Sequence, residues 1–258
     1  MAPTPIQWRI SEKGMRLAVF WAAKKLRYSI DRSSMHPRNL PEKLDHKIMG
    51  DIATISVMEY LNYIGTNATV YDLIRRDDFK RPDPGWDIVV GLDARRWGSE
   101  TNDPRNPIGL TTISVRSSRL PSNDTLETAI LSRDFKIFKQ STTIAQDLKT
   151  DLELQVYYPL ESTQIGDLDI GAAEVDMIKS ASKFDREPCE NIIEKLNVSN
   201  RWGECYLVGY DERDSMIAFN NQLKKKSWES KHKGHTKEMW VAPLENGKSM
   251  PSIKKFNI

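Results

Sequence analysis

The sequence of 258 residues predicts an α/β fold in which a mixed central β-sheet is flanked by helices. Apolar residues recur at helical spacing in two segments near the N-terminus, and they alternate with polar residues in several later segments. The two kinds of segment follow one another as helix, strand, strand, helix, strand, which is typical of one α/β unit. Hydrophobic residues make up 39% of the chain, enough to fill a core. We therefore expect a single domain over residues 1–258.

The composition excludes several classes of protein. Lys and Arg number 38 and Asp and Glu number 36, so the formal net charge is only +2, and the aromatic residues need a core in which to be buried. This argues against a disordered acidic or basic chain. Two cysteines cannot staple a chain of this length, and no run of about 18 apolar residues predicts a membrane span. The N-terminus lacks the pattern of a secretory signal, so we expect a cytoplasmic protein.

Two helices are predicted in the first quarter of the chain. Residues 9–30 carry apolar side chains at helical spacing, with basic residues between them. A linker with two prolines follows at 35–41. A longer helix is predicted for residues 42–64, where Gly65 occupies the C-cap position. Its apolar stripe consists of Leu44, Ile48, Ile52, Ile55, Met58, Leu61 and Ile64.

The strands are expected further along the chain. A break at Pro82, Pro84 and Gly85 precedes a predicted strand at 86–90, and the segment 91–109 lacks periodicity. Alternation of apolar and polar residues predicts strands at 110–119 and 152–157. The other expected elements are a short helix or strand at 70–74, helices at 125–140, 174–183 and 189–196, and strands at 206–210, 215–219 and 239–242.

Two acidic residues lie in otherwise apolar segments. Glu59 belongs to the second helix and Asp87 to the strand at 86–90, while Ser114 and Arg116 share the polar face of the next strand. A buried carboxylate is unfavourable unless it is paired or binds a metal. Mg²⁺ prefers oxygen ligands, and one or two carboxylates are sufficient. The alternative is structural: Glu59 pairs with a basic residue in the core, and Asp87 accepts a hydrogen bond at a strand end.

The order of these segments and residues resembles the PD-(D/E)XK nuclease superfamily, to which most type II restriction endonucleases belong. The Glu on the family's helix is matched by Glu59, and the Asp of its "PD" half-motif is matched by Asp87. Its (D/E)-x-K half-motif is matched by Ser114-Val115-Arg116, followed by Ser117-Ser118-Arg119. The resemblance covers about residues 44–160, with an N-terminal helix before this core and a C-terminal extension after it.

This resemblance implies a restriction-endonuclease-like core and a type II site-specific deoxyribonuclease. Such an enzyme hydrolyses phosphodiester bonds of double-stranded DNA, requires Mg²⁺ and acts as a homodimer. Asp87, Glu59 and the carbonyl of Val115 are expected to hold the metal. Arg116 is expected to stabilise charge on the phosphate, and Ser114 at most assists.

The motif also departs from the family pattern at two positions. Ser114 stands where the second metal-binding acid belongs, and Arg116 stands where the catalytic Lys belongs. Arg stays charged at any relevant pH, so Arg116 is not a general base. Family members can move the missing acid to another element, and Glu59 is the first substitute and Glu153 the second. The departures leave open a catalytically inactive DNA-binding protein on the same fold.

Basic residues supply the expected DNA contacts. Neutralised phosphates release counterions, and Arg paired with guanine is the commonest specific contact. The residues expected to contact DNA are Arg95, Arg96, Arg105, Arg119, Lys224, Lys225 and Lys226. The simpler alternative for each basic run is a solvated loop. A third class, an interaction protein unrelated to nucleic acid, also remains open.

Overall fold

The computed structural model describes residues 2–28, 38–94, 96–97, 103–120, 123–138, 148–159, 170–181, 186–222, 227–229 and 236–257. Four of the residues expected to contact DNA, namely Arg95, Lys224, Lys225 and Lys226, lie outside these ranges. The remaining candidate residues are all described.

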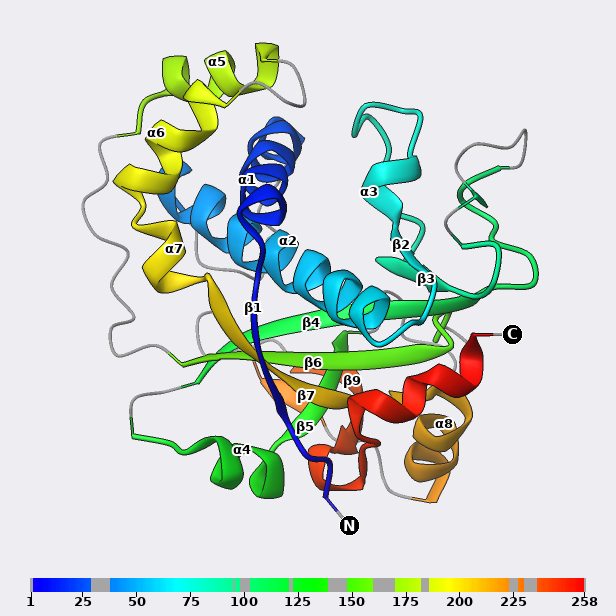
Figure 1. Cartoon of the computed structure of the whole chain (residues 1–258). Coiled ribbons are helices and arrows are strands. Elements are labelled where there is room, and N and C mark those ends of the chain that lie inside the picture. Colours follow the sequence, from blue (N-terminus) through cyan, green and yellow to red (C-terminus); the bar gives the residue numbers. More distant parts are fainter. Residues whose placement is uncertain are drawn as a thin grey trace.

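A mixed six-stranded sheet forms the centre of the fold (Figure 1). Its strands stand in the order β1-β7-β6-β4-β3-β2. Their bounds are Ile6–Arg9 for β1, Ala68–Val70 for β2, Ile88–Val90 for β3, Thr111–Leu120 for β4, Leu152–Pro159 for β6 and Glu204–Glu212 for β7. β4 and β6 run parallel, and the other neighbouring pairs are antiparallel. The predicted α/β class and mixed sheet are confirmed.

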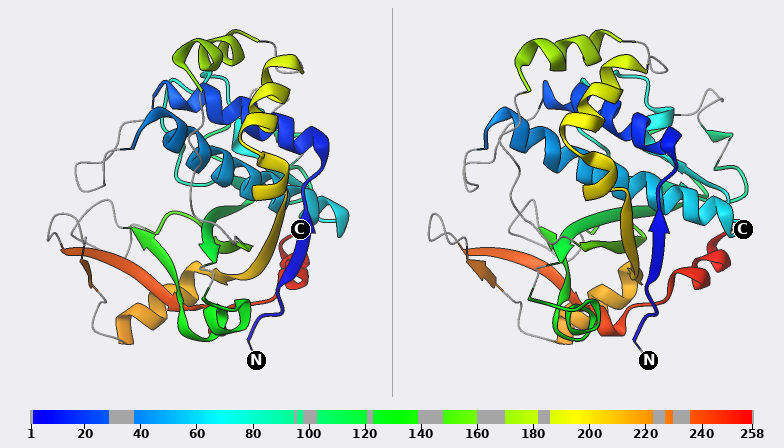
Figure 2. Two further views of the ribbon diagram at one scale, coloured as in Figure 1. Left: turned by 90° about the vertical axis from the view of Figure 1, so that its left-hand side faces the viewer. Right: turned by 60° about the vertical axis from the view of Figure 1, so that its left-hand side comes forward.

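Two long helices cover one face of this sheet. Helix α2 (Leu40–Tyr63) packs on β2 and β4, and α1 (Glu12–Leu26) packs on α2. Both views of Figure 2 show these helices, drawn in blue, on one side of the sheet. On the sheet, Leu152, Leu154 and Val156 of β6 belong to the same core as the buried residues of α1 and α2. The alternating residues of β6 therefore face the other side.

The other face carries a second, smaller core. It is built by α4 (Leu126–Ser132), α8 (Arg213–Gln222) and a three-stranded sheet in the order β5-β9-β8. The bounds of these strands are Asp134–Phe138 for β5, Ser227–Glu229 for β8 and Thr236–Pro243 for β9. Figure 2 shows this layer opposite α1 and α2. Phe135, Val208, Met216 and Leu244 are completely buried in it.

Short helices complete the described chain. They are α3 (Tyr71–Ile74), α5 (Ala172–Ser180), α6 (Glu187–Lys195), α7 (Val198–Arg201) and the 3₁₀ helices η3 (Leu244–Asn246) and η4 (Met250–Phe256). Helices α5 and α6 pack against α1. Among the described residues, no helix is long and apolar enough to cross a membrane.

Local chemistry explains where α2 begins and ends. The side chain of Asn39 accepts a hydrogen bond from the backbone N–H of Glu42, whose carboxylate accepts one from the N–H of Asn39. This reciprocal cap satisfies N–H groups that the first turn leaves without partners. After the helix, Gly65 adopts a φ of +85°, a conformation that glycine takes without strain. The predicted helix at 42–64 is confirmed to within two residues.

Three expected segments differ in the structure. Residues 6–9 form edge strand β1, so the first helix starts only at Glu12. The expected helix at 125–140 stops at Ser132, and the following residues pair with β9, with Phe135 opposite Ala242. Residues 215–219 lie in α8 rather than in a strand. In each case a short apolar pattern fits both structures, and packing against distant segments decides between them.

Candidate functional site

Asp87 lies at the edge of β4, immediately before β3 begins. Its backbone N–H donates to the carbonyl of Ile113 at 2.8 Å, and its carboxylate Oδ2 accepts the backbone N–H of Val115 at 2.7 Å. The N–H and C=O of one residue in a strand point to the same neighbour. The carbonyl of Val115 therefore faces the same side of β4 as the Asp87 carboxylate.

Glu153 lies on β6, which neighbours β4 on the side away from β3. Leu152 and Leu154 are buried beneath α1 and α2, so Glu153 between them points to the opposite face of the sheet. Ser114 of β4 pairs with Glu153 in register, and Arg116 follows two residues later on the same face. Three polar side chains of the two parallel strands are thus brought together on the face away from the long helices.

An ion pair links Arg116 to Glu153. The Nε of Arg116 lies 3.4 Å from Oε2 of Glu153, whose side chain is only 2% exposed, whereas the Arg116 side chain is 41% exposed. The other carboxylate oxygen, Oε1, accepts the hydroxyl of Thr150. Among the described residues, Oε2 is buried without a hydrogen-bond partner. Apart from the ion pair with Arg116, Oε2 of Glu153 therefore has no polar partner among the described residues.

Burial shifts the protonation of both acids. It raises the pKa of Asp87, while the N–H of Val115 and the charge of Arg116 lower it. Burial likewise raises the pKa of Glu153, the charge of Arg116 lowers it, and the nearby charge of Asp87 raises it further. The charge of Arg116 therefore affects the pKa of both Asp87 and Glu153. Groups with such shifted pKa values concentrate at functional sites.

Glu59 has a different position from the one expected. Its carboxylate accepts the backbone N–H of Ser11 at 3.0 Å and the hydroxyl of the same residue, so it caps the start of α1. The charges that act on Asp87 include that of Lys25, which lies near the other end of α1. Lys25 lies eleven positions after Gly14, which is beside Glu59, and eleven residues of helix rise about 16 Å. Ser11 also follows β1, and three strands stand between β1 and β3 in the sheet. The structure therefore does not bring Glu59 to Asp87.

A different acid of α2 lies on the side of Asp87. The Nζ of Lys25 is 2.5 Å from Oδ1 of Asp51 and 2.5 Å from Oδ2 of Asp72. Burial raises the pKa of Asp51 to about 7 despite this contact. Burial lowers the pKa of Lys25, but the nearby carboxylates, first those of Asp51 and Asp72, raise that pKa by more. The sequence pattern did not single out this cluster, although Asp51 stands in the apolar run of α2 as Glu59 does.

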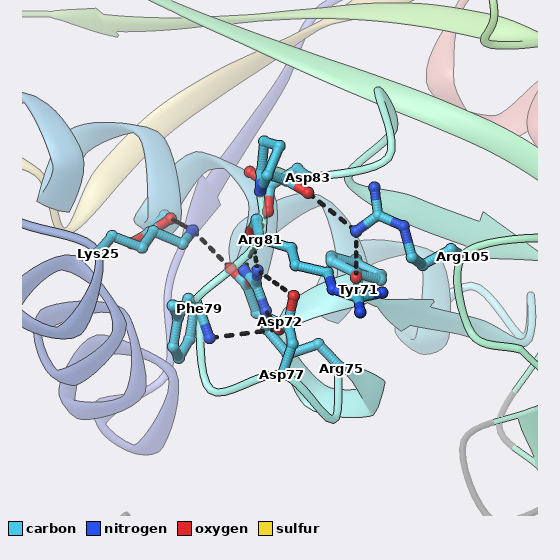
Figure 3. Close-up of polar contacts among 11 residues, drawn as sticks. Lys25, Tyr71, Asp72, Arg75, Asp77, Phe79, Arg81, Asp83 and Arg105 are labelled. Carbon is cyan, nitrogen blue, oxygen red and sulfur yellow. Dashed lines mark hydrogen bonds and ion pairs between the residues drawn. The ribbon is translucent and has the colours of Figure 1, made fainter. Parts of the chain in front are cut away.

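Arg75 fixes the turn that leads into Asp87 (Figure 3). Its side chain is 3% exposed, and its Nη1 lies 2.9 Å from Asp72 and 3.0 Å from Asp83, while its Nε lies 2.8 Å from Asp77. Asp83 belongs to the turn before β3, and Asp72 belongs to α3. The ion pairs thus connect Lys25, α3 and this turn, and they hold the backbone that carries Asp87.

The described arginines that were expected to contact DNA fall into two groups. Arg96 is exposed in the segment after β3, and Arg105 donates through Nη1 to the hydroxyl of Tyr71 at 3.2 Å and to the carbonyl of Pro82 at 2.9 Å. Arg119 instead lies 3.4 Å from buried Asp45 and over the ring of Trp202. Arg119 therefore contributes to the core beneath the long helices, whereas Arg96 and Arg105 lie in the segment where DNA contacts were expected.

The acidic groups limit how a metal is held. Within the described ranges, no cluster of three or more His, Cys, Asp and Glu side chains is arranged to hold a metal ion. A cation at the site described above would rest on Asp87, Glu153 and a main-chain oxygen.

No protein-family model, curated protein or solved structure matches the chain.

Proposed function

We propose that the protein is a type II endonuclease that hydrolyses double-stranded DNA at a specific site with Mg²⁺, on a restriction-endonuclease-like core. The observation that supports this most strongly is that Asp87 and Glu153 flank β4 from its two neighbouring strands, on the face that carries Arg116, with Glu153 ion-paired to Arg116. Glu153 then replaces the second acid that Ser114 does not supply. The enzyme would act as a homodimer, so that each subunit cuts one strand.

The oxygens on this face of the sheet suit a hard divalent cation. Asp87, Oε2 of Glu153 and the carbonyl of Val115 would hold Mg²⁺, which accepts few protein ligands and completes its shell with water and phosphate. The buried Oε2, whose one polar neighbour among the described residues is Nε of Arg116 at 3.4 Å, supports this assignment. When bound, the ion would polarise the scissile phosphate. The exposed guanidinium of Arg116 would stabilise negative charge that develops on the phosphate.

One observation favours a second candidate, a catalytically inactive DNA-binding protein. Arg116 lies 3.4 Å from Oε2 of Glu153, so a positive charge already stands beside the oxygen that a metal would use. A guanidinium can bind a DNA phosphate without a metal. In this alternative the two acids orient Arg116 and no bond is broken.

The test is a DNA digest by the purified full chain, with Mg²⁺ or with EDTA. Discrete fragments that require Mg²⁺ are expected from the wild type. Asp87→Asn and Glu153→Gln should each lower the cleavage rate by about 100-fold or more, the effect of losing a group that stabilises charge. Glu59→Gln is the matched control and should cut at close to the wild-type rate, because Glu59 caps α1.

The outcomes separate the two candidates. Undiminished cutting by Asp87→Asn would exclude the proposed site. Tight binding of DNA without cutting under any divalent cation would support the inactive binder. Neither cutting nor binding would reject both.

A further inference from the structure

A hollow of about 590 Å³ opens beside the turn that leads to Asp87. It lies between the loop after α3 and the segment around Arg105, and basic side chains, acidic side chains and Tyr71 line it. Its volume falls within the range of small-molecule sites in proteins. None of the residues that line it belongs to the proposed catalytic site.

The acidic side chains of the hollow already have partners. Each of the three aspartates is bound to a cation or to a main-chain N–H. The contacts are Asp77 to Arg75 at 2.8 Å, Asp78 to Lys24 at 2.7 Å and Asp103 to the backbone N–H of Arg105 at 3.0 Å. Two of the three aspartates are thus paired with a cation from outside the hollow, and the basic side chains that line the hollow, Arg76, Lys80, Arg81 and Arg105, outnumber the aspartates.

Hydrogen-bond donors in the hollow are positioned to bind a ligand. Nη1 of Arg105 is bound to the hydroxyl of Tyr71 and to the carbonyl of Pro82, which orients the guanidinium (Figure 3). Its Nε and Nη2 have no acceptor among the described residues. Tyr71 accepts the bond from Arg105, so its own O–H remains available to donate. The side chains of Lys80 and Arg81 are exposed, and they form no ion pair or hydrogen bond with the described part of the chain.

We propose that this hollow is a binding site for a phosphate group. Arg105 and Tyr71 would donate hydrogen bonds to it, and Lys80 and Arg81 would supply further positive charge. A planar guanidinium matches two phosphate oxygens at once, and such charge-assisted bonds are stronger than neutral ones. The site breaks no bond and requires no metal, so it stands independently of the proposed nuclease activity.

The phosphate can come from a nucleic-acid backbone or from a free nucleotide. Pro82, which accepts a bond from Arg105, begins the turn that leads to Asp87. A backbone phosphate in the hollow would therefore place a duplex alongside the candidate catalytic edge. A free nucleotide would instead fill the hollow by itself.

Binding in EDTA tests the proposal without any cleavage. The probes are a fluorescent 12-base-pair duplex, followed by anisotropy, and ADP and pyrophosphate, followed by calorimetry. Arg105→Gln and Arg81→Gln should each weaken the probe that binds by about tenfold, the effect of one lost charge-assisted bond. Arg9→Gln is the matched control, because Arg9 lies on the opposite edge strand β1 with a side chain that is 69% exposed. It should leave binding within about twofold of the wild type.

Each result of these binding measurements either supports or overturns the phosphate site. Binding of the duplex alone, weakened by the variants in the hollow, supports a nucleic-acid phosphate, and binding of ADP or pyrophosphate supports a free nucleotide. No binding of any probe at millimolar concentration overturns the proposal, as does binding that these variants leave unchanged. If Arg105→Gln fails to fold, Arg81→Gln and Lys80→Gln decide the matter, because those side chains are exposed and no ion pair or hydrogen bond links them to the described part of the chain.

Discussion

The ammonium group of Lys25 on α1 lies 2.5 Å from the carboxylate of Asp51 on α2, where the two helices cross. The same ammonium group contacts Asp72 at 2.5 Å, and Asp72 in turn contacts Arg75. The side chains of Lys25 and Asp51 are only 18% and 9% exposed. This chain of buried charges joins the helical layer to the turn that positions Asp87, so the candidate site depends on it for its geometry.

Removal of the Lys25 charge should strongly destabilise the fold. Lys25→Met keeps most of the side-chain volume but leaves Asp51 and Asp72 without their shared cation. Breaking a buried ion pair from one side lowers the free energy of unfolding by about 3–5 kcal/mol, and we expect a loss toward the lower end because Asp72 retains Arg75. Urea unfolding measures it, with Lys13→Met as the exposed control on the same helix. A loss below about 1 kcal/mol would contradict a structural role for the cluster.

Titration of Asp51 should make stability depend on pH. Its pKa in the folded protein is about 7, above its ordinary value of 3.8, so the folded state binds a proton more readily than the unfolded state. This contribution is fully present below about pH 4 and is lost as the pH rises toward about 7. Asp51→Asn cannot titrate, so its stability relative to the wild type should increase from pH 5 to pH 8. A difference between Asp51→Asn and the wild type that stays constant with pH would refute this assignment.

The raised pKa values of Asp87 and Glu153 predict how Mg²⁺ dependence varies with pH. Carboxylates bind a metal only after losing their protons. If these two acids hold the metal, the Mg²⁺ concentration for half-maximal cleavage should fall as the pH rises from about 5 to about 8. Measurement of DNA affinity in EDTA at each pH corrects for changes in substrate binding. A requirement independent of pH would point to other ligands.

Long periodic elements could be predicted from the sequence, and short ones could not. The stripe of α2 extends over six turns, and the alternation in β6 places Leu152, Leu154 and Val156 on one face. The stripe of α2 does not fit a strand, and the alternation in β6 does not fit a helix. In residues 215–219, by contrast, Met216 and Phe219 satisfy a helix as well as a strand. The second core, which contains Met216, decides in favour of α8.

The same distinction applies to the candidate site. Asp87, Ser114 and Arg116 were predicted on adjacent strands, because strand order and alternation fix their neighbourhood. Glu153 was only the second substitute acid, although its register opposite Ser114 brings it to the same face. Helical periodicity assigned Glu59 to α2 but did not indicate which end of α1 it meets. That depends on the angle between two helices, which no local pattern records.

Asp45 anchors the buried end of the helical layer. It is completely buried, and it accepts Nε1 of Trp202 at 2.9 Å and guanidinium groups of Arg119 and Arg201, each at 3.4 Å. Asp45→Ala would leave these donors unmatched and should lower the free energy of unfolding by about 3–5 kcal/mol.

The control for this variant is Asp214→Ala, whose side chain is 95% exposed and which should change stability by less than about 0.5 kcal/mol. Similar urea midpoints for both variants would argue against the anchor. The same contact affects any test of DNA binding by Arg119, because Arg119→Ala should lose stability along with any phosphate contact.

Two helical glycines should respond in opposite directions to the same substitution. A Cβ at Gly14 would lie 2.5 Å from Oε1 of Glu59 and 2.9 Å from Cγ1 of Ile10 and Cγ2 of Ile55, whereas nothing lies within 4 Å of a Cβ at Gly50. Gly14→Ala must separate α1 from α2 or displace Glu59 from its cap, and it should destabilise by about 1–3 kcal/mol.

Gly50→Ala, inside α2 and facing open space, should stabilise by about 0.5–1 kcal/mol, because alanine loses less backbone entropy in a helix. Thermal and urea unfolding of both variants measure the pair. Equal effects would mean that α1 and α2 do not approach each other closely at Gly14. Because that approach seats Glu59 on Ser11, the result also tests the assignment of Glu59 as a helix cap rather than a metal ligand.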